Sequence, residues 1–295
     1  MRLLASSITM PRIVRRDAKF AISARSVPEE TPVALVFHGT TLAVLMATPA
    51  DLEDFAVGFS LTEGIIRDPS EIEDLSVIFS DEGIEVRMWL RTDRAEQFQS
   101  RRRSLIGPTG CGLCGIESLA AAAVPGRHVS GNTRLSAVDI EAAVDALANG
   151  QTLNKITRAT HAAGFYLLGK GLLFAREDVG RHNALDKLAG ALGQAGLTGG
   201  AGAVVITSRV SVEIVQKTAA IGSPVLIAIS APTALAIRTA DACGLTLVAV
   251  ARGASFEVYS PRSCSGHQGR RNRCVTVRYF SFALASPELY PLRQG

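Results

Sequence analysis

The sequence predicts an α/β protein with an N-terminal α+β domain followed by a three-layer α/β domain. Two short apolar runs, 33–39 and 41–47, meet at Gly39-Thr40, a spacing typical of a β-hairpin. Beyond residue 200, continuous apolar runs alternate with helical patterns, which indicates a mostly parallel sheet covered on both faces. With 47% hydrophobic and 20% charged residues over 295 positions, the chain can bury a sizeable core. Disordered, collagen-like and coiled-coil chains are therefore excluded.

The first third of the chain continues as α+β after this hairpin. Residues 51–65 begin with acids and carry apolar residues at helical spacing, which predicts a helix. The runs 76–80 and 84–90 flank Asp81-Glu82-Gly83 and predict a second hairpin. The charged stretch 91–103 then leads into a glycine-rich loop and is the candidate linker between domains.

The second part alternates more regularly. Ser136 with Asp139 three residues on is a capping-box pattern that opens a helix over 137–148. Residues 164–169 and 172–176 predict a hairpin, and Asn183 is expected to start the helix 183–194. Strands and helices then follow in the order strand 202–208, helix 212–221, strand 224–230, helix 233–244, strand 245–251 and strand 256–260.

These patterns divide the chain into five predicted segments. They are a basic strip 1–25, an α+β domain 26–105, a loop and linker 106–124, an α/β domain 125–260 and a basic, disordered tail 261–295. The net charge of +4 is uneven, because 1–25 and 261–295 each carry six bases and one acid, while 26–260 carries −6. A nucleic-acid partner would have to bind the two ends, and we expect none.

A cytoplasmic protein without a membrane segment is expected. Twenty uncharged residues, 218–237, have the length of a spanning helix, but turn residues at Gly222-Ser223-Pro224 and 230–233 divide them. A buried strand between two helices fits this stretch better. The N-terminal residues show no sustained apolar run of a signal peptide, and five cysteines in so apolar a chain favour a reducing compartment.

The glycine-rich loop holds Cys111 and Cys114 within the sequence GCGLCG, 110–115. The three glycines match a dinucleotide fingerprint, but the residues before them are a poor strand. A zinc site needs four ligands, and the other cysteines do not form a second pair, so no structural metal is predicted. Two unreactive loop cysteines remain an alternative.

Reactive sulfur chemistry is the favoured interpretation of this pair. Flanking glycines leave the sulfurs uncovered, and the helical pattern behind them places the pair near a helix N-terminus. There the helix dipole, with Arg101 to Arg103 nearby in sequence, favours thiolate over thiol. Two such thiols can exchange a disulfide or pass sulfane sulfur from one to the other.

Two further clusters suit an anionic ligand. The run 176–187 is rich in charge; a solvated helix is one interpretation, but Arg181, His182 and the free N–H groups of a helix start together form an anion site. The cluster 207–211, with Arg209, lies at the end of a predicted strand, where α/β sheets bind ligands. His161 precedes another strand, and a lone histidine there is more often structural.

Together these strings resemble the FdhD family of formate dehydrogenase accessory sulfurtransferases. The resemblance runs from Glu30 to Tyr259. Its motifs are Met46-x-Thr48-Pro49, Gly58-Phe59-x-x-Thr62-Glu63-Gly64-Ile65, Cys111-Gly-x-Cys114-Gly115, His161-Ala162-Ala163, Glu177-Asp178-Val179-Gly180-Arg181-His182-Asn183-Ala184-x-Asp186-Lys187, Arg209-Val210-Ser211-x-Glu213 and Ala231-Pro232-Thr233.

The resemblance implies a sulfurtransferase that acts through a cysteine persulfide, with Cys111 as the persulfide carrier and Cys114 as its partner. Sulfur would come from a cysteine desulfurase and pass to Mo-bis(molybdopterin guanine dinucleotide), or its tungsten form, bound as substrate for the formate dehydrogenase catalytic subunit. The cofactor segment matches Val250, Ala251, Arg252, Gly253, Ala254 and Ser255. Arg181, His182, Arg209 and His161 are the further candidate cofactor-binding residues, and a homodimer is expected.

The family's second domain is similar to the cytidine deaminase fold, although the zinc motifs of deaminases are absent from this sequence. Before His161 the family usually has glycines, where Arg158 and Ala159 stand here, and many members have Ser-Gly before Arg209. Two alternative functions remain open. One is a cofactor-binding chaperone without sulfur chemistry, and the other is a CxxC thiol–disulfide oxidoreductase.

Overall fold

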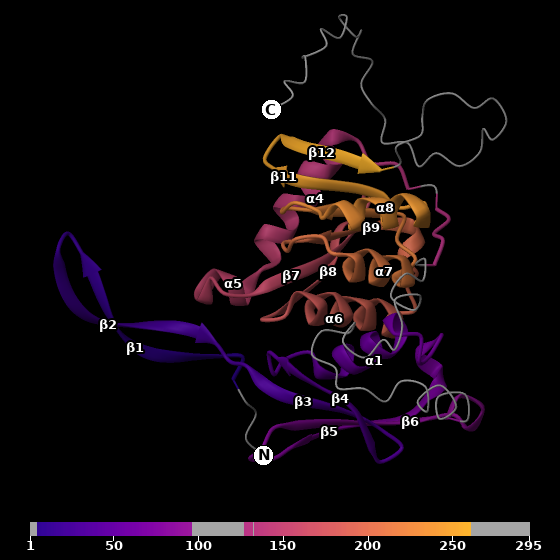
Figure 1. Cartoon of the computed structure of the whole chain (residues 1–295), viewed down its shortest axis with the longest axis horizontal. Coiled ribbons are helices and arrows are strands. Elements are labelled where there is room, and N and C mark those ends of the chain that lie inside the picture. Colours follow the sequence, from indigo (N-terminus) through magenta and orange to yellow (C-terminus); the bar gives the residue numbers. More distant parts are fainter. Residues whose placement is uncertain (1–4, 96–126, 132, 261–295) are drawn as a thin grey trace, which may run out of the picture.

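A computed structural model describes residues 5–95, 127–131 and 133–260. The predicted CxxC loop with Cys111 and Cys114, and the predicted tail 261–295, lie outside the described residues. Three sheets organise the described chain: a two-stranded ribbon, a four-stranded sheet and a six-stranded sheet. Figure 1 shows the two larger sheets in separate lobes, with the ribbon projecting to one side.

The ribbon is an N-terminal hairpin of β1 (Ser7–Arg16) and β2 (Lys19–Pro28), hereafter the arm. Its strands are antiparallel and pair without a register shift from Ser7 opposite Pro28 to Arg16 opposite Lys19. Asp17 and Ala18 form the turn with φ of 48° and 63°, the positive values that a two-residue hairpin turn of matching twist requires. Most arm side chains are exposed, so it contributes little to either core.

The small lobe is the four-stranded sheet, ordered β4-β3-β6-β5, with helix α1 on one face. It comprises β3 (Thr31–Phe37), β4 (Thr40–Ala47), α1 (Leu52–Thr62), the 3-10 turn η1 (Pro69–Glu71), β5 (Ile72–Phe79) and β6 (Ile84–Leu90). Alternation along the strands places Val33, Leu35 and Phe37 inward against Phe55 of α1, all at most 1% exposed. Both predicted hairpins and the predicted helix are confirmed.

The large lobe is built on the six-stranded sheet, ordered β12-β11-β10-β9-β7-β8. Its elements are α4 (Ala137–Gly150), α5 (Thr152–Thr157), β7 (His161–Leu167), β8 (Gly171–Asp178), α6 (Arg181–Gln194), the 3-10 turn η2 (Gly199–Ala201), β9 (Gly202–Ile206), α7 (Val212–Ile221), β10 (Val225–Ala228), α8 (Ala234–Cys243), β11 (Thr246–Arg252) and β12 (Ser255–Ser260). The capping box at Ser136 and Asp139 is present as predicted.

Three layers are confirmed in this lobe. One core cluster joins α6, α7 and α8 to one face of the sheet, and includes Leu188, Ile214 and Val204. A second cluster joins α4 to the other face, and includes Leu147 and Val205. Consecutive residues of β9 thus point into different cores, which explains why this strand is apolar throughout. The predicted likeness to the cytidine deaminase fold stays a prediction.

The strands that helices separate, β9, β10 and β11, pair in parallel as predicted, and the predicted hairpin of β7 and β8 is antiparallel. The sheet as a whole is mixed rather than mostly parallel, because β12 pairs antiparallel with β11 and β7 pairs antiparallel with β9. One further expectation about this lobe is wrong. Asn183 does not cap α6, which begins at Arg181 with Gly180 as its N-cap. Asn183 is instead the third residue of the helix, within its first turn, where its side chain makes a buried contact described below.

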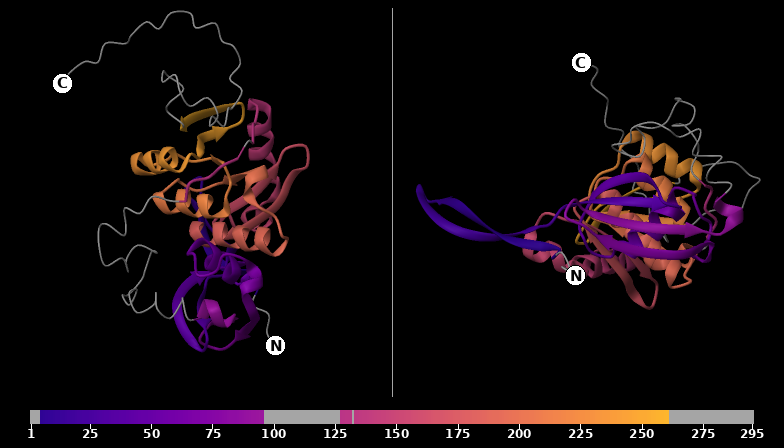
Figure 2. Two further views of the ribbon diagram at one scale, coloured as in Figure 1. Left: turned by 90° about the vertical axis from the view of Figure 1, so that its right-hand side faces the viewer. Right: turned by 90° about the horizontal axis from the view of Figure 1, so that it is seen from below.

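The two lobes meet where α1 crosses α6. Figure 2 shows α1 between the four-stranded sheet and the helices of the large lobe. Gly58 of α1 and Gly190 of α6 allow this approach: a Cβ at Gly58 would lie 1.7 Å from the Asp186 carbonyl oxygen, and one at Gly190 would lie 1.9 Å from that of Asp54. Two backbones this close require glycine on both helices. In the described part of the chain, no helix is long and apolar enough to cross a membrane.

Candidate functional site

The predicted site residues gather at one edge of the six-stranded sheet. Strands β8, β9, β10 and β11 all point the same way, so their carboxyl ends meet there. Helices α6, α7 and α8 each begin just after one of these ends. Because β7 runs the other way, its first residue, His161, lies at the same edge, opposite Asp178 at the end of β8. This carboxyl edge is where open α/β sheets bind ligands.

Asp178 organises the loop that starts α6. Its buried carboxylate accepts hydrogen bonds from Gly180 N at 2.7 Å, Asn183 Nδ2 at 3.0 Å and Thr48 N at 3.0 Å, and Lys187 Nζ lies 2.7 Å away. Lys187 also donates to the Thr48 carbonyl at 2.9 Å. The small lobe thus fixes the position of the α6 N-terminus through the residue that follows β4.

The side chain of Glu177, the residue before Asp178, caps a different helix. Its carboxylate accepts from the backbone N–H groups of Leu153 and Asn154, each at 2.7 Å, and so caps the N-terminus of α5. Arg158 ends α5 with a left-handed φ of 58°. Arg158 therefore adopts the backbone conformation that glycine favours.

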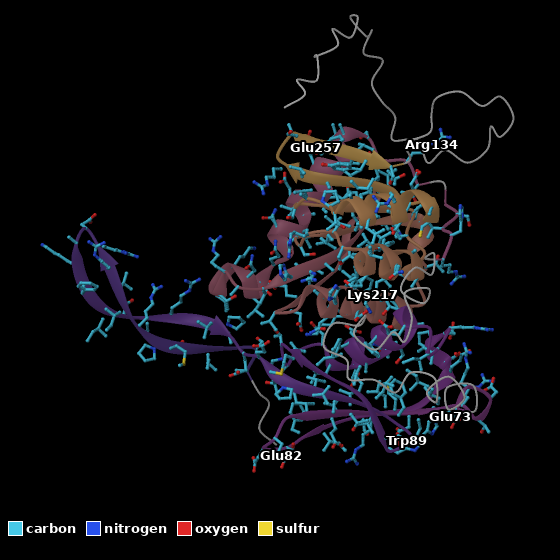
Figure 3. All side chains as sticks on the ribbon, viewed as in Figure 1. Glu73, Glu82, Trp89, Arg134, Lys217 and Glu257 are labelled. Carbon is cyan, nitrogen blue, oxygen red and sulfur yellow. The ribbon has the colours of Figure 1, made fainter. Side chains whose placement is uncertain are left out.

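A second buried cluster lies where α1, α6 and α7 meet, close to the label Lys217 in Figure 3. Lys217 Nζ donates to Thr62 Oγ1 at 2.9 Å, Glu63 Oε1 at 2.8 Å and both carboxylate oxygens of Asp186. Burial raises the pKa of Asp186, although Lys217 and Thr62 partly oppose this. Burial alone would lower the pKa of Lys217, but Asp186 and Glu63 together raise it. The cluster is a satisfied ionic junction between lobes.

His182 connects this junction to the carboxyl edge. Its Nε2 lies 3.0 Å from Glu213 Oε2 on α7, and Glu213 also accepts from Ser211 Oγ at 3.0 Å. Burial, with the positive charge of Arg181, lowers the pKa of His182, and Glu213 only partly opposes this. His182 is therefore a neutral imidazole near pH 7, held against α7 with a quarter of its side chain exposed.

His161 is the second neutral imidazole at this edge. Burial and the nearby Arg181 lower its pKa, while Asp178 partly opposes the shift. The strand behind it is fixed by Thr207 Oγ1, which accepts from Ala162 N at 2.9 Å. Because Arg181 acts on both imidazoles, His161, Arg181 and His182 form one electrostatic group at the start of α6.

Three arginines supply positive charge along the carboxyl edge. Arg181 follows β8, Arg209 follows β9, and Arg252 ends β11; the last two are exposed. Within residues 5–95, 127–131 and 133–260, no carboxylate forms an ion pair with any of them. Unpaired guanidinium groups suit phosphate or carboxylate ligands.

The helix starts at this edge add backbone donors. Among the described residues, no N-cap side chain makes a hydrogen bond to the first turn of α6 or α7, whereas Thr233 caps α8 and Ser136 caps α4. The first-turn N–H groups of α6 and α7 are thus available to an anion, and both helix dipoles favour negative charge there.

The predicted cofactor segment 250–255 forms the end of β11 and the turn into β12. Arg252 pairs with Ser255 across Gly253 and Ala254, and a register irregularity separates Ala249 from Arg252. Within it Val250 has φ of 53°, a conformation that a β-branched residue adopts only under strain. Such strain is common at functional sites, because the surrounding structure must hold it in place.

The structure brings His161, Arg181, His182, Arg209 and Arg252, which come from separate motifs of the sequence, to one edge; their role in cofactor binding stays a prediction. It also shows that most charged residues of 176–187 are buried and paired, so the interpretation of a solvated helix is wrong. Sequence reasoning assigned no role to Thr48, Thr62, Lys187 or Lys217. Their partners lie up to 155 residues away in the sequence. Thr48, Thr62 and Lys187 stand in the quoted motifs, and that position was the one signal that pointed to them.

The fold and the site define a mixed α/β protein whose six-stranded sheet carries, within the residues that the structure describes, arginines without carboxylate partners at its carboxyl edge. Residues 28–264 match the model of the FdhD/NarQ family. The chain is 55% identical over 258 residues to the sulfur carrier protein FdhD of Agrobacterium fabrum, covering 87% of this chain and 95% of that protein. It is 52% identical to the sulfur carrier protein FdhD of Brucella abortus, covering 84% and 93%.

This chain therefore belongs to the FdhD/NarQ family. The fold agrees with a crystal structure described as that of a formate dehydrogenase accessory protein of Desulfotalea psychrophila. The TM-score is 0.69 at 24% identity, over 88% of this chain and 99% of that one.

Proposed function

We propose that this protein is a sulfur carrier that serves formate dehydrogenase. The observation that carries the proposal is the family match, which spans 28–264 and includes the Cys111-Gly-x-Cys114 motif. The relatives of 55% and 52% identity are named sulfur carrier proteins, and they are covered over nearly their full length.

Sulfur transfer through Cys111 needs no external oxidant. The Cys111 thiolate attacks the terminal sulfur of a persulfide on a cysteine desulfurase, and the desulfurase thiolate leaves. One S–S bond breaks as another forms, so Cys111 gains one sulfane sulfur. Cys114 then relays that sulfur or assists its release by attacking the Cys111 persulfide.

The substrate that receives this sulfur is the bis(molybdopterin guanine dinucleotide) cofactor, with molybdenum or tungsten. Its guanine-dinucleotide phosphates are anions and suit the carboxyl edge of the large lobe. In this proposal they lie against the uncapped start of α6 beside Arg181 and His182, with Arg209 and Arg252 further along the same edge of the sheet. His161 and His182 stay neutral because their pKa values are lowered, so each offers one ring nitrogen as a proton acceptor.

The buried contacts of Asp178 and Lys217 support this proposal indirectly. They hold α6 and α7 rigidly against the small lobe, so the helix starts that face the ligand are positioned before it binds. The final recipient of the sulfurated cofactor is the catalytic subunit of formate dehydrogenase. We further propose that the protein acts as a homodimer in the cytoplasm.

Maturation of formate dehydrogenase in cells that lack the endogenous carrier tests this function. The Cys111→Ala variant is expected to yield inactive formate dehydrogenase while folding normally. The matched control is Cys243→Ala, because Cys243 is fully buried in α8, away from the carboxyl edge, and its variant should support full activity. Full maturation by Cys111→Ala would overturn the assignment of the nucleophile and favour a chaperone that carries the cofactor without sulfur chemistry.

A further inference from the structure

One face of the arm carries an apolar stripe that the fold leaves uncovered. The register pairs Ile13 with Ile22, and Phe20 lies on the same face, two residues before Ile22. Ile13, Phe20 and Ile22 are 73%, 72% and 89% exposed. Pro11 and Ala24, which pair with each other and are also exposed, extend the stripe towards the base of the arm. An isolated two-stranded ribbon is marginally stable in water, and an apolar face this exposed indicates an interaction surface.

The opposite face of the arm holds most of its positive charge. Arg16 pairs with Lys19 beside the turn, and Arg12 and Arg25 lie on the same face nearer the base. The arm, 7–28, carries five bases against one acid, a net charge of +4, and four of the five bases are on this face. The arm is thus a ribbon with two chemically different faces, one apolar and one basic.

The arm projects from the body of the molecule. Figure 1 and the right-hand view of Figure 2 both show it extending clear of the two lobes. At its base, Arg25 Nη2 donates to the Thr157 carbonyl on α5 at 2.8 Å, while the other bases of the arm lie further out towards the turn. The family match begins at residue 28, where β2 ends, so the arm lies outside the matched fold. A ribbon held in this way can reach a flat surface without obstruction by the lobes.

The surface of an anionic lipid bilayer suits both faces of the arm at once. Segments that lie in the bilayer interface bury an apolar face about 5–10 Å deep, and they carry Lys and Arg on the opposite face, where anionic headgroups attract them. The arm has the same division, and because it is a single layer of backbone, Arg16 and Lys19 stay at headgroup depth when the stripe enters the acyl boundary. Nucleic acid or an acidic protein surface would bind the basic face and leave the apolar stripe in water.

Charge on the adjacent lobe orients such binding. Residues 29–95, which form the small lobe, carry four bases against fourteen acids, a net charge of −10. An anionic surface therefore repels the small lobe while it attracts the arm. The arm would thus contact the bilayer with the small lobe held away from it.

We propose that the arm binds the surface of an anionic lipid bilayer. Ile13, Phe20 and Ile22 enter the boundary between headgroups and acyl chains, and Arg16 and Lys19 contact the lipid phosphates. The contact holds the body of the protein beside a membrane without a spanning segment. The inference concerns where the protein is held, so it goes beyond the proposed sulfur chemistry and does not rest on it.

Co-sedimentation of the full chain with lipid vesicles tests the proposal. The wild type should bind vesicles that mix phosphatidylglycerol with phosphatidylcholine, and its affinity for vesicles of phosphatidylcholine alone should be at least about tenfold lower. The arm contributes little to either core, so variants in it are expected to fold normally. A wild type that binds neither kind of vesicle, or both equally well, would overturn the proposal.

A charge reversal in the arm tests the basic face. Lys19→Glu should raise the dissociation constant for the anionic vesicles about 25-fold, because each charge at the surface contributes roughly fivefold and the change alters the charge by two. Lys170→Glu is the matched control, since Lys170 is an exposed base in the turn between β7 and β8, outside the arm, and it should bind as the wild type does. Equal losses in the two variants would show that net charge, and not the arm, drives binding.

A polar substitution in the stripe tests the apolar face. Ile22→Ser should weaken binding at least about tenfold, because an isoleucine side chain no longer leaves water. Val138→Ser is its control, because Val138 on α4 is 67% exposed and outside the arm, and it should bind as the wild type does. If Ile22→Ser also binds as the wild type does, only the basic face is in use. An acidic protein surface or nucleic acid is then the partner, and the proposal is wrong.

A tryptophan on each face of the arm reports which face enters the lipid. Trp89 is the single tryptophan of the chain, so Trp89→Phe gives a background without tryptophan fluorescence. In that background, lipids brominated in their acyl chains should quench the Phe20→Trp variant strongly and the Ala21→Trp variant weakly. The reason is that residues 20 and 21 are neighbours on β2 that point to opposite faces. Equal quenching of the two variants, or stronger quenching of Ala21→Trp, would contradict a stripe that lies in the acyl boundary.

Discussion

Lys187 Nζ lies 2.7 Å from Asp178 Oδ2, and neither side chain is exposed to solvent. The pair connects the middle of α6 to the loop before it, and both residues also bond the backbone of Thr48 in the small lobe. Two residues that a sequence motif presents as surface charge therefore form a buried junction between lobes.

Replacing Lys187 with methionine should destabilise the protein strongly. The change leaves Asp178 buried without its cation, and such losses cost about 3–5 kcal/mol. Urea unfolding followed by circular dichroism measures the effect. The control is Arg91→Met, which removes an exposed pair with Asp93 at 3.8 Å and should cost no more than about 1 kcal/mol. Equal effects of the two changes would show that the Lys187 pair is not buried.

Gly58→Ala should loosen the contact between α1 and α6. An alanine Cβ would lie 1.7 Å from the Asp186 carbonyl oxygen, so one helix must move. We expect a loss of about 1–3 kcal/mol or more, measured by thermal unfolding. Gly200→Ala is the control, because a Cβ there has its nearest neighbour at 4.0 Å. If both alanine variants unfold at the same temperature, the close approach of these helices is wrong.

The lowered pKa values of His161 and His182 predict how stability depends on pH. The unfolded chain takes up protons at about pH 6.5, before the folded protein does, so lowering the pH through this range should favour unfolding. Above that range both imidazoles are neutral in both states, and they contribute no pH dependence.

NMR titration of the imidazole resonances checks this prediction. Both pKa values should lie below 6.5, and Arg181→Ala should raise them because a nearby positive charge is removed. Arg238→Ala, an exposed arginine on α8, should leave both unchanged. Histidines that titrate normally in the wild type would contradict the burial and charge described for this edge.

Arg181→Ala should also weaken the binding of guanosine diphosphate. One charge-assisted contact to phosphate is worth about 1.5–3 kcal/mol, so the dissociation constant should rise by roughly 10- to 100-fold in calorimetry. Arg238→Ala serves again as the control and should bind as the wild type does. An unchanged affinity in Arg181→Ala would refute the phosphate site at the start of α6.

Local patterns predicted the elements of the fold well, because they depend on neighbours in sequence. The hairpin turns at Gly39 and Gly83 and the capping box at Ser136 are examples. The sheet direction was harder, since an apolar strand buried on both faces looks the same whether it pairs in parallel or not. β7 is such a case, because it is buried along most of its length and pairs antiparallel with β9, to which no hairpin connects it.

Side-chain contacts between residues far apart in the sequence were not predictable from the spacing of motifs. Lys217 was expected only as part of a helix, yet it bonds Thr62 and Asp186, which lie 155 and 31 residues away. Asn183 was expected to cap α6 because asparagine favours that position. The tertiary contacts to Asp178 and to the Met46 carbonyl explain its place three residues after the N-cap. The sequence indicated only the positive charge of the arm, and not its two strands. Because both faces of these strands are mostly exposed, no buried face gives them the alternation of apolar and polar residues that predicts a strand.

The most direct test of the account is mass spectrometry of the protein after incubation with a cysteine desulfurase and cysteine. We predict a gain of one sulfur on the peptide that carries Cys111 and Cys114, removable by a thiol reductant, and none on the peptide of the buried Cys243. No gain of sulfur on the Cys111 peptide, or only a reversible disulfide between Cys111 and Cys114, would contradict the sulfur-carrier function.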